Sequence, residues 1–393
     1  MFRNNRNLLV IALIAVVNAL GYGIIIPILY TYTERFGLNA FQYGLLFALF
    51  SLCQFIATPI IGRLSDKYGR KPLLLASIGG TAVSFFMLAF APNAIVLFLA
   101  RALDGLTAGN IPVAAAVISD TTEPKDRVRG FGIIGASFGF GLFVGPAISG
   151  LTVGISPAIP FIIAGIISVI AVLLTWFLLP ETNKHIGEVK HDSLFNFSKL
   201  FHSLFDPNVG TTFLITLVYF ISFGIFITSF QPFAQGVLSL NPQWISFIFS
   251  FFGLIGIISQ VFFVQRLSRF FGLKKAFTIS LGIVSIGFLL IGLSNNLYMF
   301  LIASVLMGLF NNSVQPLTQA ILSEETDAKS QGSMQGLNAS YMSIGMIIGP
   351  LLAGVLATYS LAVPFYGSAV CVLVGFVLSF WIMRPGFKKE SAF

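Results

Sequence analysis

Two ionisable side chains lie inside long apolar runs of this 393-residue chain, and their spacing suits proton chemistry. Arg101 and Asp104 are three residues apart, so on a helix they share one face and can form an ion pair. An ionisable group inside a membrane helix costs about 2.5–3.5 kcal/mol and is a functional candidate by default. A substrate that displaced Arg101 would let Asp104 take a proton. A permanent structural pair that holds the helix in its bundle is the alternative, and the sequence leaves both open.

Uncharged polar side chains recur at helical spacing in several of the apolar runs. The residues that we assign to a substrate cavity are Asn18, Tyr22, Gln54, Asn311, Asn312, Gln315, Asn338 and Tyr341. Hydrogen bonding between helices is the other interpretation, since each such bond contributes a modest ~0.6 kcal/mol. A cavity of amides and aromatic rings with one carboxylate and one guanidinium suits amphipathic compounds better than multiply charged metabolites.

Other kinds of chemistry lack the residues that they require. His185, His191 and His202 lie in one polar loop at spacings of 6 and 11, which do not place two metal ligands on one helical face. No Walker A pattern is present, so we expect no ATP hydrolysis by this chain. We find no cluster of histidine, cysteine or carboxylate that would act as a catalytic site, and we expect neither an enzyme nor a cofactor.

Composition indicates the elements that position these residues. The chain is 56% hydrophobic and only 9% charged, whereas soluble domains average about 25% charged residues. A multispanning membrane protein is therefore predicted. Apolar runs of about 20 residues predict twelve membrane helices, near 7–30, 41–61, 72–92, 95–118, 131–154, 159–179, 211–236, 244–265, 274–293, 297–322, 334–357 and 363–384.

The basic residues predict how these helices are oriented. With the N-terminus in the cytoplasm, every Lys and Arg except Arg35 and Arg101 falls on the cytoplasmic side. Such a bias predicts that both termini are cytoplasmic. The formal net charge of +8 is thus a topology signal rather than a nucleic-acid footprint. The partners that we expect are membrane lipid, a small-molecule substrate and protons, without nucleic acid, and we expect a monomer.

The chain also carries an internal repeat. Two sets of six spans, in residues 1–180 and 211–393, are separated by a polar cytoplasmic linker at 181–210. A shift of 203 or 204 residues aligns GRLSDKYGRKP (62–72) with QRLSRFFGLKK (265–275), AVISDTTEPK (116–125) with AILSEETDAK (320–329), and GLFVGPAISG (141–150) with GMIIGPLLAG (345–354). These matches predict an all-α membrane fold of two six-helix halves related by pseudo-two-fold symmetry.

Three motifs resemble those of a known family. GRLSDKYGRKP, ARALDGLTAG (100–109) and GLFVGPAISG resemble motifs of the major facilitator superfamily, and within it of the twelve-span drug/proton antiporters that include tetracycline exporters. The resemblance covers the whole chain and implies that two halves rock about a midplane site. It implies proton-coupled efflux of amphipathic small molecules across the cell membrane. Proton-coupled uptake or facilitated diffusion of a metabolite, such as a sugar or an organic acid, is the alternative.

The same resemblance implies a cytoplasmic gate. Its residues would be Gly62, Asp66, Gly69, Arg70 and Asp120. Asp66 would meet the N-terminus of a helix in the other half, Arg70 would pair with Asp120, and the glycines would permit close approach and a tight turn. Exposed ion pairs contribute only about 0–1 kcal/mol each, so such a gate can open. The second copy has Arg269 where the first has Asp66, so its gate must differ. A loop that only sets topology is the alternative.

The fifth span carries the motif that resembles the family's antiporter motif. Its residues are Gly141, Gly145, Pro146 and Gly150. The family commonly has two final glycines, whereas this chain has Ser149 and Gly150 there. Small residues at spacings of four permit close helix packing in lipid, and the proline predicts a bend.

Overall fold

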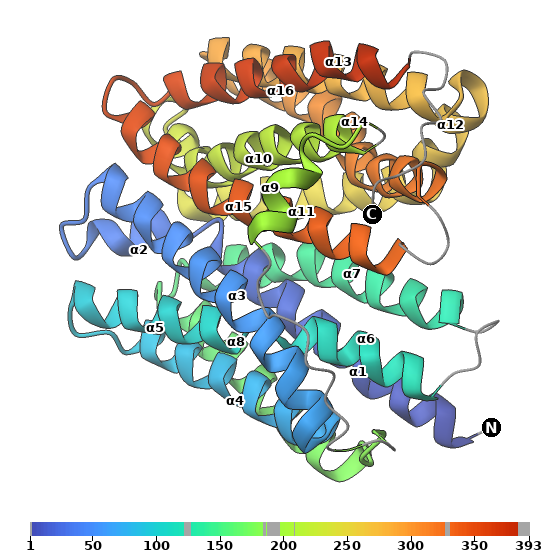
Figure 1. Ribbon diagram of the computed structural model, residues 1–393. Coiled ribbons are helices and arrows are strands. Elements are labelled where there is room, and N and C mark those ends of the chain that lie inside the picture. The colour runs from blue at the N-terminus through green and yellow to red at the C-terminus, as the bar shows by residue number, and fades with distance from the viewer. Residues whose placement is uncertain are drawn as a thin grey trace. The chain divides into compact units, whose positions relative to one another are not determined.

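The computed structural model describes residues 2–121, 127–183, 186, 197–207, 209–326 and 331–383. Every regular element within these ranges is a helix, and twelve helical stretches are long and apolar enough to cross a membrane (Figure 1). The prediction of an all-helical protein with twelve spans is therefore confirmed.

The first six spans comprise α1 (Phe2–Ile25), α3 (Ala40–Tyr68), α4 (Arg70–Ala89), α5 (Ala94–Thr107) with α6 (Asn110–Thr121), α7 (Arg127–Thr152) and α8 (Ile159–Leu178). The last six comprise α10 (Gly210–Gly236), α11 (Pro242–Ile258) with η1 (Ser259–Phe263) and α12 (Val264–Phe271), α13 (Leu273–Leu293), α14 (Leu297–Glu324), α15 (Gln331–Ala357) and α16 (Val363–Ile382). Two short helices, α2 (Leu29–Glu34) and α9 (Phe197–Ser203), lie outside the spans.

Several span ends differ from the predicted ones. The first span ends at Ile25 rather than near residue 30, because Pro27 disfavours helical backbone in the residue before it. The second span continues to Tyr68 instead of ending at residue 61. Residues 62–68, which we expected to lie in a loop, therefore form the last two turns of α3. Gly69 alone separates α3 from α4.

Span 4 is divided within the apolar region. Helix α5 ends at Thr107 and α6 begins at Asn110. Pro112 has no backbone N–H and clashes with the preceding turn, which accounts for the break. The side chain of Asn93 starts α5 by accepting a hydrogen bond from the Val96 N–H, as Asn296 does from Met299 at the start of α14.

The chain divides into two compact units. The first contains 1–39, 49–194 and 240–254, and the second contains 40–48, 195–239 and 255–393. Each unit uses the same pattern of helix pairs: α1 with α7, α4 with α8 and α4 with α5 in the first, and α10 with α15, α13 with α16 and α13 with α14 in the second. The helix packing therefore repeats as the motifs do, although the division at 181–210 stays a prediction.

Candidate functional site

A buried ion pair occupies α5. The Arg101 Nη1 lies 2.8 Å from the Asp104 Oδ2, and the two side chains are only 2% and 11% exposed. The hydroxyl groups of Thr81 and Ser84 on α4 are hydrogen-bonding partners of the Asp104 carboxyl. Removing one partner of a buried pair leaves an uncompensated charge and typically costs 3–5 kcal/mol. The two residues that sequence analysis selected are thus joined in one buried ion pair without net charge.

Aromatic and amide groups from two other helices meet this pair. The Arg101 guanidinium carbon lies 4.2 Å from the ring centroid of Phe50 on α3. The edge of the Tyr22 ring contacts Phe50 at a centroid distance of 5.5 Å, and the Tyr22 hydroxyl donates to the Gln54 Oε1 at 3.3 Å. Tyr22 and Gln54 therefore lie beside the pair. The sequence did not indicate Phe50, since nothing distinguishes it from the other 42 phenylalanines.

Asn18 has a more local role than its assignment to the cavity suggested. Its Nδ2 donates to the Ile14 carbonyl one turn earlier in α1, at 3.4 Å. The amide thus bonds within its own helix.

The polar residues of the second unit form separate hydrogen-bonded pairs. The Tyr219 hydroxyl donates to the Asn311 Oδ1 at 2.9 Å, and the Thr216 hydroxyl donates to the Asn338 Oδ1, also at 2.9 Å. Sequence analysis missed both donors, although their spacing of three residues places them on one face of α10. Asn312 instead donates to the Gly308 carbonyl of its own helix at 2.7 Å.

Two other cavity assignments need different descriptions. Gln315 is exposed in the second unit. Tyr341 is only 2% exposed, and its hydroxyl bonds to Ser203 and to the Leu200 carbonyl of α9. This hydroxyl anchors the short helix α9, and the assignment of Tyr341 to the cavity stays a prediction.

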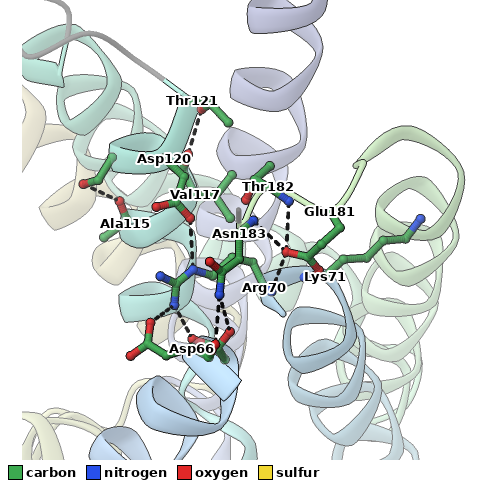
Figure 2. Close-up of polar contacts among 12 residues, drawn as sticks. Asp66, Arg70, Lys71, Ala115, Val117, Asp120, Thr121, Glu181, Thr182 and Asn183 are labelled. Atoms are coloured by element: carbon green, nitrogen blue, oxygen red, sulfur yellow. Dashed lines mark hydrogen bonds and ion pairs between the residues drawn. The ribbon is translucent and has the colours of Figure 1, made fainter. Parts of the chain in front are cut away.

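Arg70 is the centre of an ionic network in the first unit (Figure 2). Its Nη1 lies 2.6 Å from the Asp66 Oδ1, and its Nε lies 3.0 Å from the Asp120 Oδ2. Its Nη1 also donates to the Ser65 hydroxyl at 2.7 Å. The Arg70 side chain is 12% exposed, whereas those of Asp66 and Asp120 are 49% and 25% exposed. The network thus joins the ends of α3, α4 and α6 at a boundary that water reaches.

Glu181, which follows α8, completes this network and was missed by sequence analysis. Its carboxylate accepts hydrogen bonds from the backbone N–H groups of Arg70 at 2.9 Å and Lys71 at 3.1 Å (Figure 2). These are orphan donors of the first turn of α4, where the helix dipole also favours an anion. A carboxylate does cap a helix here, but it is Glu181 within the first unit. The expected contact of Asp66 with a helix of the other half stays a prediction.

The two motif glycines differ in their geometry. Gly69 has φ +105° and ψ 159°, a conformation that is essentially confined to glycine. Gly62 lies inside α3, and no atom of the described part of its own unit stands within 4 Å of the position that a Cβ would occupy. The close approach expected at Gly62 stays a prediction.

The second unit has a different ionic network at the repeated position. The Lys274 Nζ lies 3.0 Å from the Glu325 Oε1 and donates to the Ile382 carbonyl at 3.1 Å. The Thr212 hydroxyl donates to the other Glu325 oxygen at 3.3 Å. Burial raises the pKa of the Glu325 carboxyl in spite of the opposing attraction of Lys274. One lysine and one glutamate thus connect the ends of α10, α13, α14 and α16.

The glycines of α7 serve close helix packing. A Cβ at Gly141 would overlap Ala19 and the Val16 carbonyl of α1, and a Cβ at Gly145 would crowd Gly23. Gly150 faces the Phe247 ring of α11, and Pro146 lies within the helix without ending it. In the second unit, Gly345 and Gly349 contact α10 in the same way. The motif therefore brings two backbones together.

Two units that repeat the same helix packing, with twelve helical stretches long and apolar enough to cross a membrane, have the arrangement of transporters that are built from internal repeats. The chain belongs to the Major Facilitator Superfamily, whose family model matches residues 11–269 and 212–392. It is accordingly a multi-pass membrane transport protein with a small-molecule substrate.

Similar proteins are known in several bacteria. The chain is 34% identical to the class H tetracycline resistance protein of Pasteurella multocida, covering 95% of this chain and 94% of that protein. It is 31% identical to the class B tetracycline resistance protein of Escherichia coli, covering 99% and 100%. It is 28% identical to the quinolone resistance protein NorA of Staphylococcus aureus, covering 91% and 92%.

Solved structures share the fold at lower sequence identity. The nucleoside transporter NupG superposes with a TM-score of 0.77 at 16% identity, covering 96% of this chain and 99% of that one. The human organic anion transporter MFSD10 gives a TM-score of 0.72 at 20% identity, with the same coverage.

Proposed function

We propose that this protein exports amphipathic small molecules across the cell membrane in exchange for protons, by alternating access of its two halves. The tetracycline and quinolone resistance proteins to which it is similar support this substrate class. The observation that carries the proton coupling is the buried pair of Arg101 and Asp104. Asp104 lies ten residues into span 4, about 15 Å along the helix axis and near the middle of a bilayer.

Exchange requires that substrate and proton exclude each other at one site. In the proton-loaded form Asp104 is neutral, and Arg101 is released from its carboxylate. Substrate binding then favours the ionised carboxylate and expels the proton. The opposite order, in which substrate displaces Arg101 and Asp104 takes a proton, would move both solutes in the same direction.

The Arg70 network would act as the cytoplasmic gate of this cycle. Its two carboxylate partners are partly exposed, and exposed pairs contribute about 0–1 kcal/mol each. Such a network can form in one state and separate in the other. Both termini would lie in the cytoplasm, because all Lys and Arg residues except Arg35 and Arg101 lie on that side of the predicted topology. The protein would act as a monomer.

The decisive experiment measures proton release from the purified protein in detergent and weak buffer when a tetracycline, a quinolone or a lipophilic cation is added. Wild type should release protons, whereas Asp104→Asn should bind the compound without releasing any. Asp66→Asn serves as a matched control, since it removes a carboxylate of the cytoplasmic network and should leave release intact.

Other outcomes would change the proposal. Proton uptake in place of release would replace exchange by cotransport. Binding of a sugar or an organic acid, without any proton change and unaffected by Asp104→Asn, would replace drug export by uptake or facilitated diffusion and make the ion pair structural.

A further inference from the structure

We propose that the end of span 8, in α12, binds an anionic phospholipid through its phosphate headgroup. The basic side chains of this site are Arg266, Arg269 and Lys275, and the rings of Phe262 and Phe270 lie on the same stretch of chain. All five residues belong to the second unit, and all five are exposed. The bound lipid would hold this turn at the membrane surface. Such binding is independent of the proposed exchange of drug and proton, and it adds no step to the transport cycle.

The last turns of span 8 extend to the depth of the lipid headgroups. The helical stretch Pro242–Phe271 has 30 residues, which is about 45 Å at 1.5 Å per residue. The hydrocarbon core of a bilayer is only about 30 Å thick. Because the apolar run within this stretch ends near residue 265, the part that extends beyond the core is α12, which carries the two arginines.

Basic and aromatic side chains alternate along one face of this helix. Phe262, Arg266 and Phe270 follow one another at spacings of four residues, so they form one stripe. The Arg266 guanidinium carbon lies 5.9 Å from the centroid of the Phe262 ring, and Phe262 and Phe270 are 53% and 83% exposed. Aromatic rings and arginine side chains are favoured where acyl chains meet headgroups. The stripe therefore suits a lipid, with the rings against the acyl chains and the guanidinium at the phosphate.

The basic side chains of this turn lack the carboxylates that the equivalent turn of the first unit has. At the first turn, Arg70 bonds to two carboxylates, and a third one caps the following helix. At the second turn, the Glu325 carboxylate is paired with the lysine that precedes Lys275. Arg266, Arg269 and Lys275 form no ion pair with the residues that the structure describes. A group of four Lys and Arg residues directly beyond a membrane helix is typical of binding to anionic lipid.

A phosphate group matches the donors that these side chains offer. A guanidinium has five N–H donors in a planar arrangement and binds phosphate oxygens in pairs. The Arg266 Nη1 donates to the Phe262 carbonyl at 3.5 Å, and this long bond leaves its other donors for a ligand. Arg269 lies three residues further along, next to Arg266 on the helix surface. Two guanidinium groups can therefore approach one phosphodiester. A zwitterionic headgroup carries its own ammonium ion and neutralises them less well.

The test measures lipid binding to the purified protein in neutral detergent. Phosphatidylglycerol and phosphatidylcholine with the same acyl chains are titrated, and native mass spectrometry counts the bound lipid. Wild type should bind phosphatidylglycerol at the lower concentration. The double variant Arg266→Gln and Arg269→Gln should lose about thirtyfold in affinity for phosphatidylglycerol, since each basic residue near the surface contributes about fivefold. Its weaker binding of phosphatidylcholine should not change.

Two further variants separate the site from net charge and from the fold. Arg63→Gln with Lys67→Gln removes two charges from the aligned stretch of the first unit, and it should keep the affinity for phosphatidylglycerol within about threefold. Arg266→Lys with Arg269→Lys retains both charges and should restore most of the binding. All these side chains except that of Arg63 are exposed, so thermal unfolding without lipid should match wild type and show that lost binding is not lost folding.

Three outcomes would overturn the proposal. Equal binding of the two lipids by wild type would mean that the turn does not select an anionic headgroup. An equal loss in the two glutamine double variants would reduce the effect to the net charge of the protein. Displacement of phosphatidylglycerol by an equal concentration of inorganic phosphate would make the turn a site for a free anion rather than for a lipid.

Discussion

Gly69 in the first unit and Gly272 in the second have nearly the same backbone conformation, but they are surrounded by different charges. Gly69 has φ +105° and ψ 159°, and Gly272 has φ 77° and ψ 161°. Each stands alone between two helices and starts the second of them. Arg70 follows the first glycine and bonds to two carboxylates, whereas the uncharged Leu273 follows the second.

The lysines beyond these glycines retain one function in both units. Lys71 donates to the Trp176 carbonyl at 2.6 Å, and Lys274 donates to the Ile382 carbonyl at 3.1 Å. Both carbonyls belong to the last turn of the final helix of their half, where a cation is favoured. The duplicated chain thus conserved a backbone turn and a helix cap while its carboxylates changed position. The turn is structural in both units, and among the residues that the structure describes the arginine network that we propose as a gate is found at the first turn.

The largest difference is expected from alanine at the two glycines. Both substitutions put a side chain into a glycine-only conformation, which costs about 1–3 kcal/mol. A Cβ at Gly69 would also overlap the Glu181 carboxylate, whereas no described residue of its unit lies within 4 Å of a Cβ at Gly272. Gly69→Ala should therefore lower the free energy of unfolding by about 1–2 kcal/mol more than Gly272→Ala, because it also displaces the cap of α4.

Thermal unfolding of the two variants in the same detergent would measure this difference. Equal destabilisation would show that Glu181 moves aside freely and that the two turns are equivalent.

A smaller effect is expected from removing the arginine. Arg70→Ala deletes the contacts to Asp66, Asp120 and Ser65, and should cost about 1–2 kcal/mol of stability. It should reduce transport severalfold more than it reduces the amount of folded protein, because the network that we propose as the gate would no longer form. Transport assays in vesicles with equal protein content would separate the two effects.

Arg269→Ala is the control in the second unit. This exposed arginine occupies the position that aligns with Asp66, and its replacement should change neither stability nor transport. A transport defect as large as that of Arg70→Ala would place a gate at both turns and remove the contrast.

The smallest effect concerns pH and the second unit. The raised pKa of Glu325 means that its protonated form favours folding. That contribution is complete below the ordinary glutamate pKa of about 4.3 and is lost as the pH rises through the raised value. Glu325→Gln mimics the protonated side chain, so the stability of the variant should lack this loss as the pH rises.

Unfolding midpoints of wild type and Glu325→Gln between pH 4 and pH 8 would show the difference. A wild type that becomes more stable than the variant as the pH rises would mean that the attraction of Lys274 outweighs burial, contrary to the expected sign.

The elements of the fold were largely predictable from the sequence, because apolar runs of span length are set by the bilayer. The ends were not. Residues 62–68 are polar enough to suggest a loop, yet they continue α3 to Gly69, where the backbone conformation, rather than polarity, ends the helix. The repeat at an offset of 203 or 204 residues did predict that equivalent turns would occur twice.

The site was predictable where its residues are close in the chain. Arg101 and Asp104 are one turn apart, so spacing alone predicted their contact. Phe50 reaches Arg101 from another helix, and Glu181 reaches Arg70 across 111 positions. The spacing of residues within one helix does not predict contacts between segments that are far apart in the chain. For Tyr341, the predicted helix face did not tell which neighbour its hydroxyl meets.

Each unit contains a short segment from the opposite half of the sequence, which affects whether the two halves can be produced as separate polypeptides. Residues 40–48 belong to the unit built mainly from the second half, and residues 240–254 belong to the unit built mainly from the first. Within the second unit, Gly44 packs against the Pro350 carbonyl. If the gene were divided within the linker, the two halves would be made as separate polypeptides. Each polypeptide would then carry a segment that completes the unit built mainly from the other. They should accumulate when they are produced together, and each should be degraded when it is produced alone.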